Sequence, residues 1–153
     1  MDQQISLTRV QPHYTAVVRG QVQAARLAQF VTAACGEVWA FIRAAGAPTP
    51  GRNIALNLAN GSIEAGVEVS APFHGNGRVV CSQTPGGLVA TAGHLGPYHR
   101  LGDAHRSVRQ WCASHGHQAT AVSWERYGHW LPEWNADPSK ILTDIFILVR
   151  EAS

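Results

Sequence analysis

The stretch NIALNLANGSIEAGVEVSA (53–71) predicts the first supersecondary element of this 153-residue chain. Apolar and polar residues alternate on both sides of Asn60-Gly61. Asn-Gly between two alternating runs is a strong signal for a β-hairpin, because both residues accept the positive φ angles of a tight turn. The sequence therefore predicts strands over 53–60 and 62–71, joined at Asn60-Gly61.

The residues before this hairpin predict a strand and then a long helix. HYTAVVR (13–19) alternates and contains β-branched residues, as strands do. Between about Gln23 and Ala45, apolar residues recur at steps of three and four, which describes one face of a helix. Gly46 is placed to end that helix, because glycine accepts the left-handed conformation that often follows a last helical turn. The first half thus reads strand, helix, strand, strand.

The second half repeats this order of elements. GLVATAGHL (87–95) predicts a strand, about Tyr98 to His115 a helix followed by Gly116, and 121–130 and 142–149 two further strands. The predicted fold class is α+β: one antiparallel sheet with the helices on one side. A single domain then holds two modules, about 10–72 and 87–150, joined by a Gly- and Pro-rich link at about 73–86.

Composition excludes several classes of protein. With 12 basic and 10 acidic residues and no basic cluster, the chain gives no reason to expect direct nucleic-acid binding. No apolar run approaches the ~20 residues that span a membrane, and the N-terminus lacks the pattern of a signal peptide. The chain has three cysteines, an odd number, and they lie far apart in the sequence, which favours free thiols in a reducing compartment. We therefore expect a cytoplasmic, soluble protein.

The segment SWERYGHWLPEW (123–134) mixes acids with tryptophans and is the candidate site. Strand alternation places Glu125 and Tyr127 on one face of their strand, and it places Asp144 and Phe146 on one face of the last strand. If the two strands are neighbours, two carboxylates and two rings share one patch. Ring faces and a carboxylate held away from water suit a flat, lipophilic cation.

Structural roles for these acids stay open. Glu125 could face solvent and pair with Arg126 or Arg100, which would contribute little to stability. Asp144 lies within an apolar run, where an unpaired charge is costly, but it could satisfy a backbone group near the start of the strand.

The tryptophans have the same two interpretations. Trp39 and Trp111 each lie in the C-terminal part of a predicted helix, and large aromatic residues there more often belong to the core than to a pocket. Trp130 and Trp134 flank a Leu-Pro turn, so they form either a lid over the site or an exposed apolar loop.

Cofactor and metal signals are weak. Cys112, His115 and His117 crowd the end of the second helix, but no second ligand pair stands at zinc-finger spacing and no HExxH motif occurs. Partly solvated histidines are the favoured interpretation. The chain has no nucleophile elbow, phosphate-binding loop or dinucleotide fingerprint. We expect no metal and no cofactor.

The second half resembles the GyrI-like domain, the effector-binding module of bacterial multidrug-responsive transcription regulators. The similarity covers about 87–149 and is looser over 13–73. The family pattern is a strand ending in His-x-Gly-Pro-Tyr, a helix with a late Trp, then Glu-x-Tyr and a final Thr-Glu-x-aromatic strand. The matching residues are His94, Gly96, Pro97, Tyr98, Trp111, Glu125, Tyr127, Thr143, Asp144 and Phe146.

The resemblance implies two strand–helix–strand–strand (SHS2) modules related by a pseudo-twofold, with a ligand pocket between them. It implies that Glu125 is the central pocket glutamate, with Tyr127 beside it. Asp144 would be the second acid, with Asp in place of the family's Glu, and Phe146 the aromatic after it. The larger regulators carry a helix-turn-helix domain before this module. We expect the present chain to be a stand-alone member without a direct transcriptional role.

The leading functional hypothesis is a protein that binds or sequesters amphipathic, cationic aromatic compounds. Glu125 and Asp144 would supply charge, and the walls would be Tyr127, Trp39, Trp111, Trp130 and Phe146. The alternative, from stand-alone relatives, is a hydrolase of electrophilic cyclopropane-containing genotoxins, with Glu125 as general base and Tyr127 as donor. A gyrase-binding inhibitor has less support, because the ten acids form no acidic run. A homodimer stays open.

Overall fold

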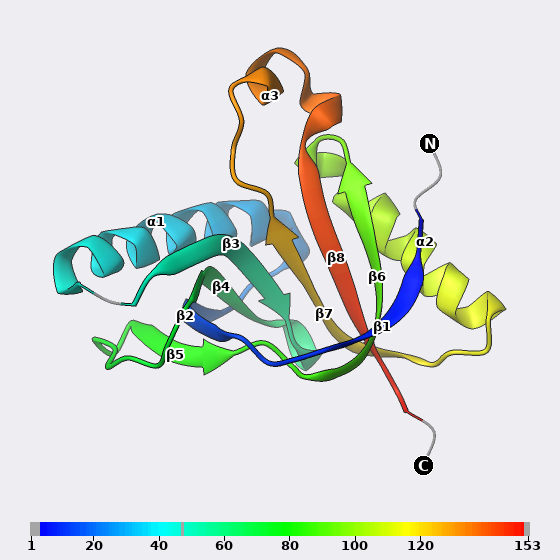
Figure 1. Cartoon of the computed structure of the whole chain (residues 1–153), viewed down its shortest axis with the longest axis horizontal. Coiled ribbons are helices and arrows are strands. Elements are labelled where there is room, and N and C mark those ends of the chain that lie inside the picture. Colours follow the sequence, from blue (N-terminus) through cyan, green and yellow to red (C-terminus); the bar gives the residue numbers. More distant parts are fainter. Residues whose placement is uncertain (1–3, 47, 152–153) are drawn as a thin grey trace. The chain divides into compact units, whose positions relative to one another are not determined.

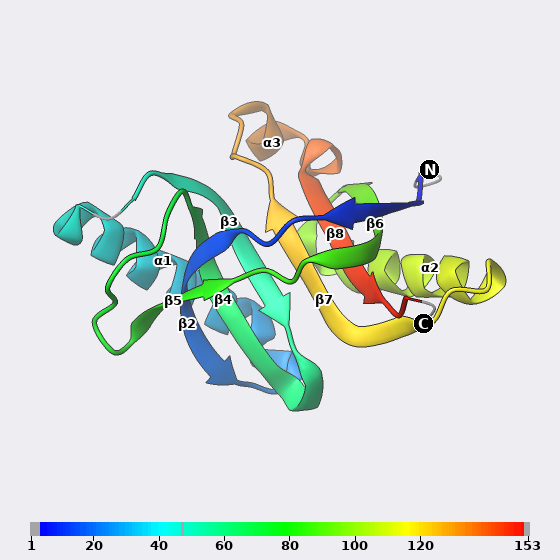
Figure 2. The ribbon, with the colours of Figure 1, turned by 60° about the horizontal axis from the view of Figure 1, so that its bottom comes forward.

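The computed structural model describes residues 4–46 and 48–151, and it divides the chain into two compact units (Figures 1 and 2). The α1 unit is Gln11–Pro85, and the α2 unit combines Met1–Val10 with Gly86–Ser153. Each unit is an antiparallel sheet with one long helix on one face, so the predicted α+β class is confirmed. The pseudo-twofold between the modules stays a prediction.

The α1 unit holds the predicted hairpin and the first helix. Its elements are β2 (Tyr14–Gln21), α1 (Leu27–Ala45), β3 (Pro50–Asn57), β4 (Ser62–Val69) and β5 (Val79–Gln83), with strand order β3-β4-β2-β5. Asn60 and Gly61 have φ angles of 64° and 75°, so the predicted turn is confirmed. Gly46 ends α1 with φ 63°. Ala34, Val38 and Ile42 of α1 pack on the sheet.

The α2 unit holds the second half of the chain and the N-terminal strand. Its elements are β1 (Ser6–Val10), β6 (Gly87–Leu95), α2 (Leu101–Ser114), β7 (Ala119–Tyr127), the short α3 (Glu133–Ala136) and β8 (Leu142–Val149), with strand order β1-β6-β8-β7. Leu101, Ala104 and Val108 of α2 pack against Ile145 and Ile147 of β8. This core fixes which face of the sheet is covered by the helix.

Two strands were not predicted, and both are short and lie at sheet edges. β5 lies within the predicted link and pairs with β2, while β1 precedes the first predicted strand and pairs with β6. An edge strand is paired on one side only and does not require a regular alternation of buried and exposed residues. SLTRV and VVCSQ therefore carry little periodic signal. No helix within the described residues is long and apolar enough to cross a membrane.

Candidate functional site

The pairing of β7 with β8 decides which face carries Glu125. Glu125 lies opposite Ile145, and Tyr127 lies opposite Thr143. Residues directly opposite each other in an antiparallel pair share a face of the sheet. Ile145 belongs to the core that α2 covers. Glu125 and Tyr127 therefore project toward the side of the sheet on which α2 packs.

Glu125 is buried, and both oxygens of its carboxylate have partners. Its residue exposure is 8%. The Tyr127 hydroxyl donates to Glu125 Oε1 over 3.1 Å, and His105 Nε2, from α2, lies 3.3 Å from Glu125 Oε2. One strand and one helix thus hold an acid between a phenol and an imidazole.

His94 lies on the same face, at the end of β6. His94 lies opposite Thr143 in the β6–β8 pair, and Thr143 lies opposite Tyr127 in the β7–β8 pair, so the three residues share one face of the sheet. Burial lowers the pKa of His94 below its ordinary value, although a hydrogen bond with the Pro97 backbone and the negative charge of Glu125 act in the opposite direction. At neutral pH His94 is therefore an uncharged imidazole.

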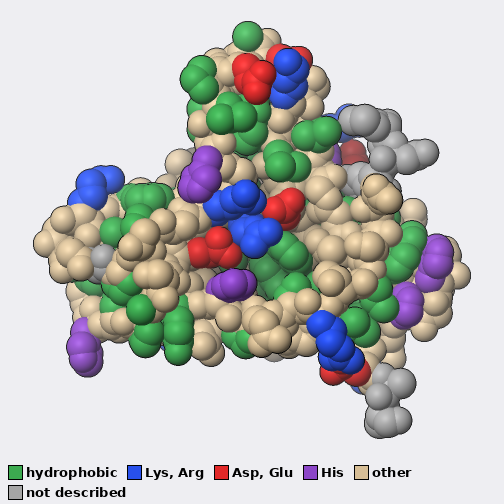
Figure 3. All heavy atoms as spheres, viewed as in Figure 1, with side chains coloured by type: hydrophobic (Ala, Val, Ile, Leu, Met, Phe, Trp, Pro, Cys, Tyr) green, Lys and Arg blue, Asp and Glu red, His purple; other side chains and the backbone are tan. Residues whose placement is uncertain are grey.

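A run of aromatic rings leads from Glu125 to the surface. Tyr98, just before α2, meets the Tyr127 ring edge-on with centroids 5.6 Å apart, and the Trp130 ring lies 6.5 Å from Tyr98. Tyr98 is 44% exposed and Trp130 50% exposed. Trp130 also meets the buried Trp134 edge-on at 5.3 Å. Hydrophobic side chains accordingly reach the surface over the segment that holds α3 (Figure 3).

We call Glu125, Tyr127, His105, Tyr98 and Trp130 the Glu125 cluster. Thr143, opposite Tyr127, adds a hydroxyl on the same face. Thr143 is fully buried, and its Oγ1 has no hydrogen-bond partner among the described residues. A buried hydroxyl without a partner costs about 1–3 kcal/mol.

Asp144 and Phe146 lie on the other face of the same strands. Asp144 is opposite Arg126 and Phe146 is opposite Trp124. The expectation that Glu125 and Asp144 share one patch is therefore wrong. The register sets Glu125 opposite Ile145, one position from Asp144, and one position along a strand reverses the face.

The opposite face has contacts of its own. Arg126 donates to Asp144 Oδ2 over 3.1 Å, and its guanidinium lies 5.2 Å from the centre of the Phe146 ring. Phe146 stacks on Trp124 with centroids 5.2 Å apart. These contacts give Asp144 and Phe146 partners within the sheet itself. A part for either residue in ligand binding stays a prediction.

Trp39 and Trp111 pack against the cores of their own units. Trp39 Nε1 donates to Asn53 Oδ1 over 2.7 Å within the α1 unit. Trp111 stacks on His115 at 4.3 Å and on His117 at 5.7 Å, at the C-terminal end of α2. Trp111 follows His105 by six residues, about 9 Å along the helix. Their part in ligand binding stays a prediction.

The two histidines near Cys112, His115 and His117, stack on the Trp111 ring. Cys112 is buried in the core of the α2 unit, while the His115 ring Nδ1 lies 2.8 Å from the Trp111 carbonyl oxygen. Across residues 4–46 and 48–151, no three or more His, Cys, Asp or Glu side chains are grouped so that they could hold a metal ion.

Sequence reasoning missed two members of the cluster. Tyr98 lies in the His-x-Gly-Pro-Tyr motif, but the motif alone gave it no role. His105 follows Leu101 by four residues and precedes Val108 by three, so it lies on the inward face of α2. A histidine at an inward helical position was the available signal.

No protein-family model matches the chain. No curated protein matches it either. Solved structures do match its fold. The crystal structure of the EcmrR C-terminal domain aligns with a TM-score of 0.78 at 20% identity, over 99% of this chain and all of that domain. A chain of EcmrR in a complex with DNA aligns with a TM-score of 0.74 at 19% identity, over 98% of this chain and 58% of that one.

Two further structures of similar fold are a ligand complex and a hydrolase. SAV2435 bound to tetraphenylphosphonium aligns with a TM-score of 0.57 at 13% identity, over 98% of this chain and 94% of that one. A hydrolase encoded by lin2189 from Listeria innocua aligns with a TM-score of 0.63 at 10% identity, over 95% and 91%. At these identities the likeness establishes the fold alone, and that fold agrees with the expected GyrI-like domain.

Proposed function

We propose that this protein, which has the fold of the GyrI-like effector-binding domains, binds amphipathic cationic aromatic compounds at the Glu125 cluster. The observation that carries the proposal is a buried carboxylate with a run of aromatic rings from it to the surface. SAV2435, of similar fold, is described with tetraphenylphosphonium, a lipophilic aromatic cation. We place this activity in the cytoplasm.

The chemistry of the cluster supports such a ligand. A cation near Glu125 would be attracted more strongly than in water, because the carboxylate is buried. Tyr98 and Trp130 are partly exposed, so their faces could stack on aromatic groups. Each cation–π contact contributes about 0.5–2 kcal/mol. A ligand with several rings around one positive charge can use both features together.

Tetraphenylphosphonium is the probe that tests the proposal, in a calorimetric titration of the wild type and Glu125→Gln. The matched control is Glu133→Gln, an exposed glutamate paired with Lys140 at 3.6 Å. Both substitutions remove one negative charge. We expect Glu125→Gln to weaken binding at least ~10-fold, or ~1.4 kcal/mol, and Glu133→Gln to weaken it less than ~2-fold.

Triphenylphosphine oxide, a neutral analogue with similar rings, tests the part played by charge. We expect it to bind the wild type more weakly than the phosphonium, and Glu125→Gln to reduce that preference. Equal affinities for the two probes, or equal effects of the two glutamate variants, would rule out a charge-selective site at Glu125.

Hydrolysis is the second candidate, favoured by the contact of Glu125 with His105. A carboxylate beside an imidazole and a phenol can act as a general base with a nearby donor. For an electrophilic cyclopropane conjugated to a carbonyl, Glu125 would take a proton from water while the water oxygen bonds to a ring carbon. The ring C–C bond would break and its electron pair would move to the conjugated carbonyl oxygen, which would take a proton from the Tyr127 hydroxyl, while Glu125 returns the proton of the water to Tyr127, its hydrogen-bond partner.

Mass spectrometry separates this reaction from binding. The product carries the mass of one added water, and it accumulates beyond one equivalent of protein if the reaction turns over. Quantitative recovery of an intact cyclopropane substrate after long incubation would leave binding as the function.

A further inference from the structure

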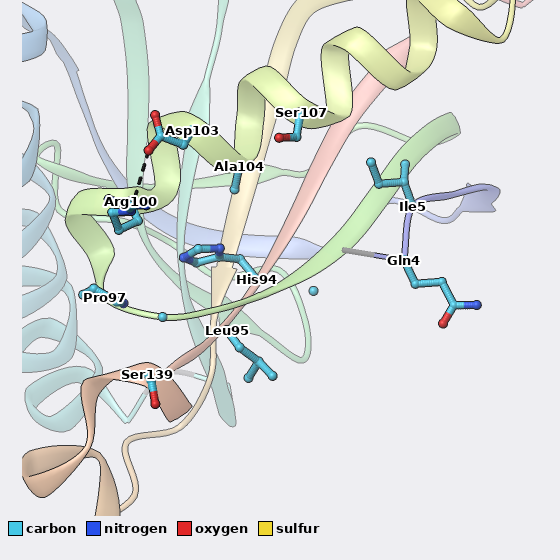
Figure 4. Close-up of a pocket in the computed structure, with 12 residues that line it drawn as sticks. Gln4, Ile5, His94, Leu95, Pro97, Arg100, Asp103, Ala104, Ser107 and Ser139 are labelled. Atoms are coloured by element: carbon cyan, nitrogen blue, oxygen red, sulfur yellow. Dashed lines mark ion pairs between the residues drawn. The ribbon is translucent and has the colours of Figure 1, made fainter. Parts of the chain in front are cut away.

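A cavity lies in the α2 unit, on the flank of α2 opposite His105. Its volume is about 640 Å³, within the usual range of small-molecule pockets. One side of α2 lines it with Asp103 and Ser107, and Arg100, the residue just before the helix, lies on the same side. His105 projects from the other side of the helix. The end of β6 supplies His94 and Leu95 (Figure 4).

The charges around this cavity favour an anion. Arg100 and Asp103 both line the cavity and pair at 3.7 Å, and Asp103 also pairs with Arg106, which lies outside the lining, so Asp103 is neutralised without using Arg100 alone. The cavity also lies at the N-terminal end of α2, where backbone N–H groups contribute partial positive charge.

The rest of the lining indicates a small organic molecule. Ser107 and Ser139 supply hydroxyls, while Leu95 and Pro97 supply apolar surface. The Arg100 guanidinium is 63% exposed and its contact with Asp103 is long, so its remaining N–H groups can reach a ligand. Arginine binds carboxylates through two parallel hydrogen bonds. We propose that this cavity binds a small organic carboxylate, with Arg100 as its anchor.

This site differs from the Glu125 cluster in place and in the charge of its ligand, and it does not depend on the proposed function. His94 connects the two, since it lines the cavity and lies in the field of Glu125. The charged or titratable groups that act on His94 are Glu125, Arg100 and His105. A carboxylate beside His94 would favour its protonated form and so raise its pKa.

Benzoate is the probe for the test, added at constant ionic strength to the ¹⁵N-labelled 153-residue chain while amide and histidine-ring NMR signals are followed. Arg100→Gln and Arg106→Gln form a matched pair, because both arginines contact Asp103 and only Arg100 lines the cavity. We expect Arg100→Gln to weaken benzoate binding at least ~10-fold and Arg106→Gln less than ~2-fold. A titration with benzyl alcohol, which lacks the negative charge of benzoate, should give no saturable change in these NMR signals.

The results that overturn this proposal are distinct from those that overturn cation binding. Saturable shifts at Gly96 and Ser107, a raised His94 pKa and the predicted difference between the arginine variants would support the carboxylate site. No saturation with benzoate, or equal weakening in both arginine variants, would refute it. Glu125→Gln, which tests phosphonium binding, should leave benzoate binding in place.

Discussion

Glu125 and Asp144 lie on opposite faces of the same pair of strands. Glu125 is set opposite Ile145 and faces the side covered by α2, whereas Asp144 is set opposite Arg126 and contacts it. The two acids therefore act in different surroundings. Glu125 is held by a phenol and an imidazole, and Asp144 neutralises a guanidinium that lies over Phe146.

Asp144→Asn should lower stability without much change in cation binding. The substitution removes the negative charge that Arg126 contacts at 3.1 Å in a partly buried position. We expect a loss of about 1–2 kcal/mol in the free energy of unfolding, measured by urea denaturation. The affinity for tetraphenylphosphonium should change less than ~3-fold. A loss of affinity as large as that of Glu125→Gln would assign Asp144 to the ligand site.

Trp130 should report ligand binding, and Trp111 should not. Trp130 lies 6.5 Å from Tyr98 in the Glu125 cluster, while Trp111 stacks on His115 near the end of α2. We expect Trp130→Phe to abolish most of the fluorescence quenching by a rhodamine-type cation. Trp111→Phe should retain it. The reverse pattern would place the ligand near the C-terminal end of α2.

Burial of His94 should make stability fall in mild acid. The ordinary pKa of histidine is 6.5, and burial lowers the pKa of His94 in the folded protein. Between the two values the unfolded chain binds more protons than the folded chain, so stability rises with pH in that window. As pH falls below 6.5, the His94 contribution is lost progressively until pH reaches the lower folded pKa.

The check on this pH dependence is a comparison of urea unfolding from pH 5 to 8 for the wild type and His94→Gln, a range chosen to span the ordinary histidine pKa. The variant should show a flatter dependence below the histidine pKa. An identical slope in both proteins would mean that other groups cause the acid sensitivity.

The three thiols should differ in reactivity. Burial raises the pKa of Cys35 to about 11 and also raises the pKa of Cys112, whereas Cys81 is partly exposed. At pH 8 the Cys35 thiol, with a pKa of about 11, is only ~0.1% thiolate, the reactive form. We expect a disulfide reagent to modify Cys81 first and the other two slowly. Urea should make all three react quickly, and three fast thiols in the folded protein would contradict the burial.

Local sequence patterns predicted most of the fold, because each acts over a few residues. Asn60-Gly61 determined the hairpin, Gly46 ended α1, and the last strand was predicted over its whole length, 142–149. The edge strands β1 and β5 were not predicted, because each pairs on one side only within its unit and has little alternating pattern.

Apart from the edge strands β1 and β5, the sequence by itself determined the order of the main helices and strands and the presence of Glu125 and Tyr127 on one strand face. Period-two alternation fixes which residues of a strand share a face, and no other part of the chain is needed for that. Only the tertiary structure decided what each face meets. The β7–β8 register separated Asp144 from Glu125, and the packing of α2 brought His105 to the carboxylate. Both relationships join residues far apart in sequence, so they arise from strand register and helix packing, which local periodicity does not encode.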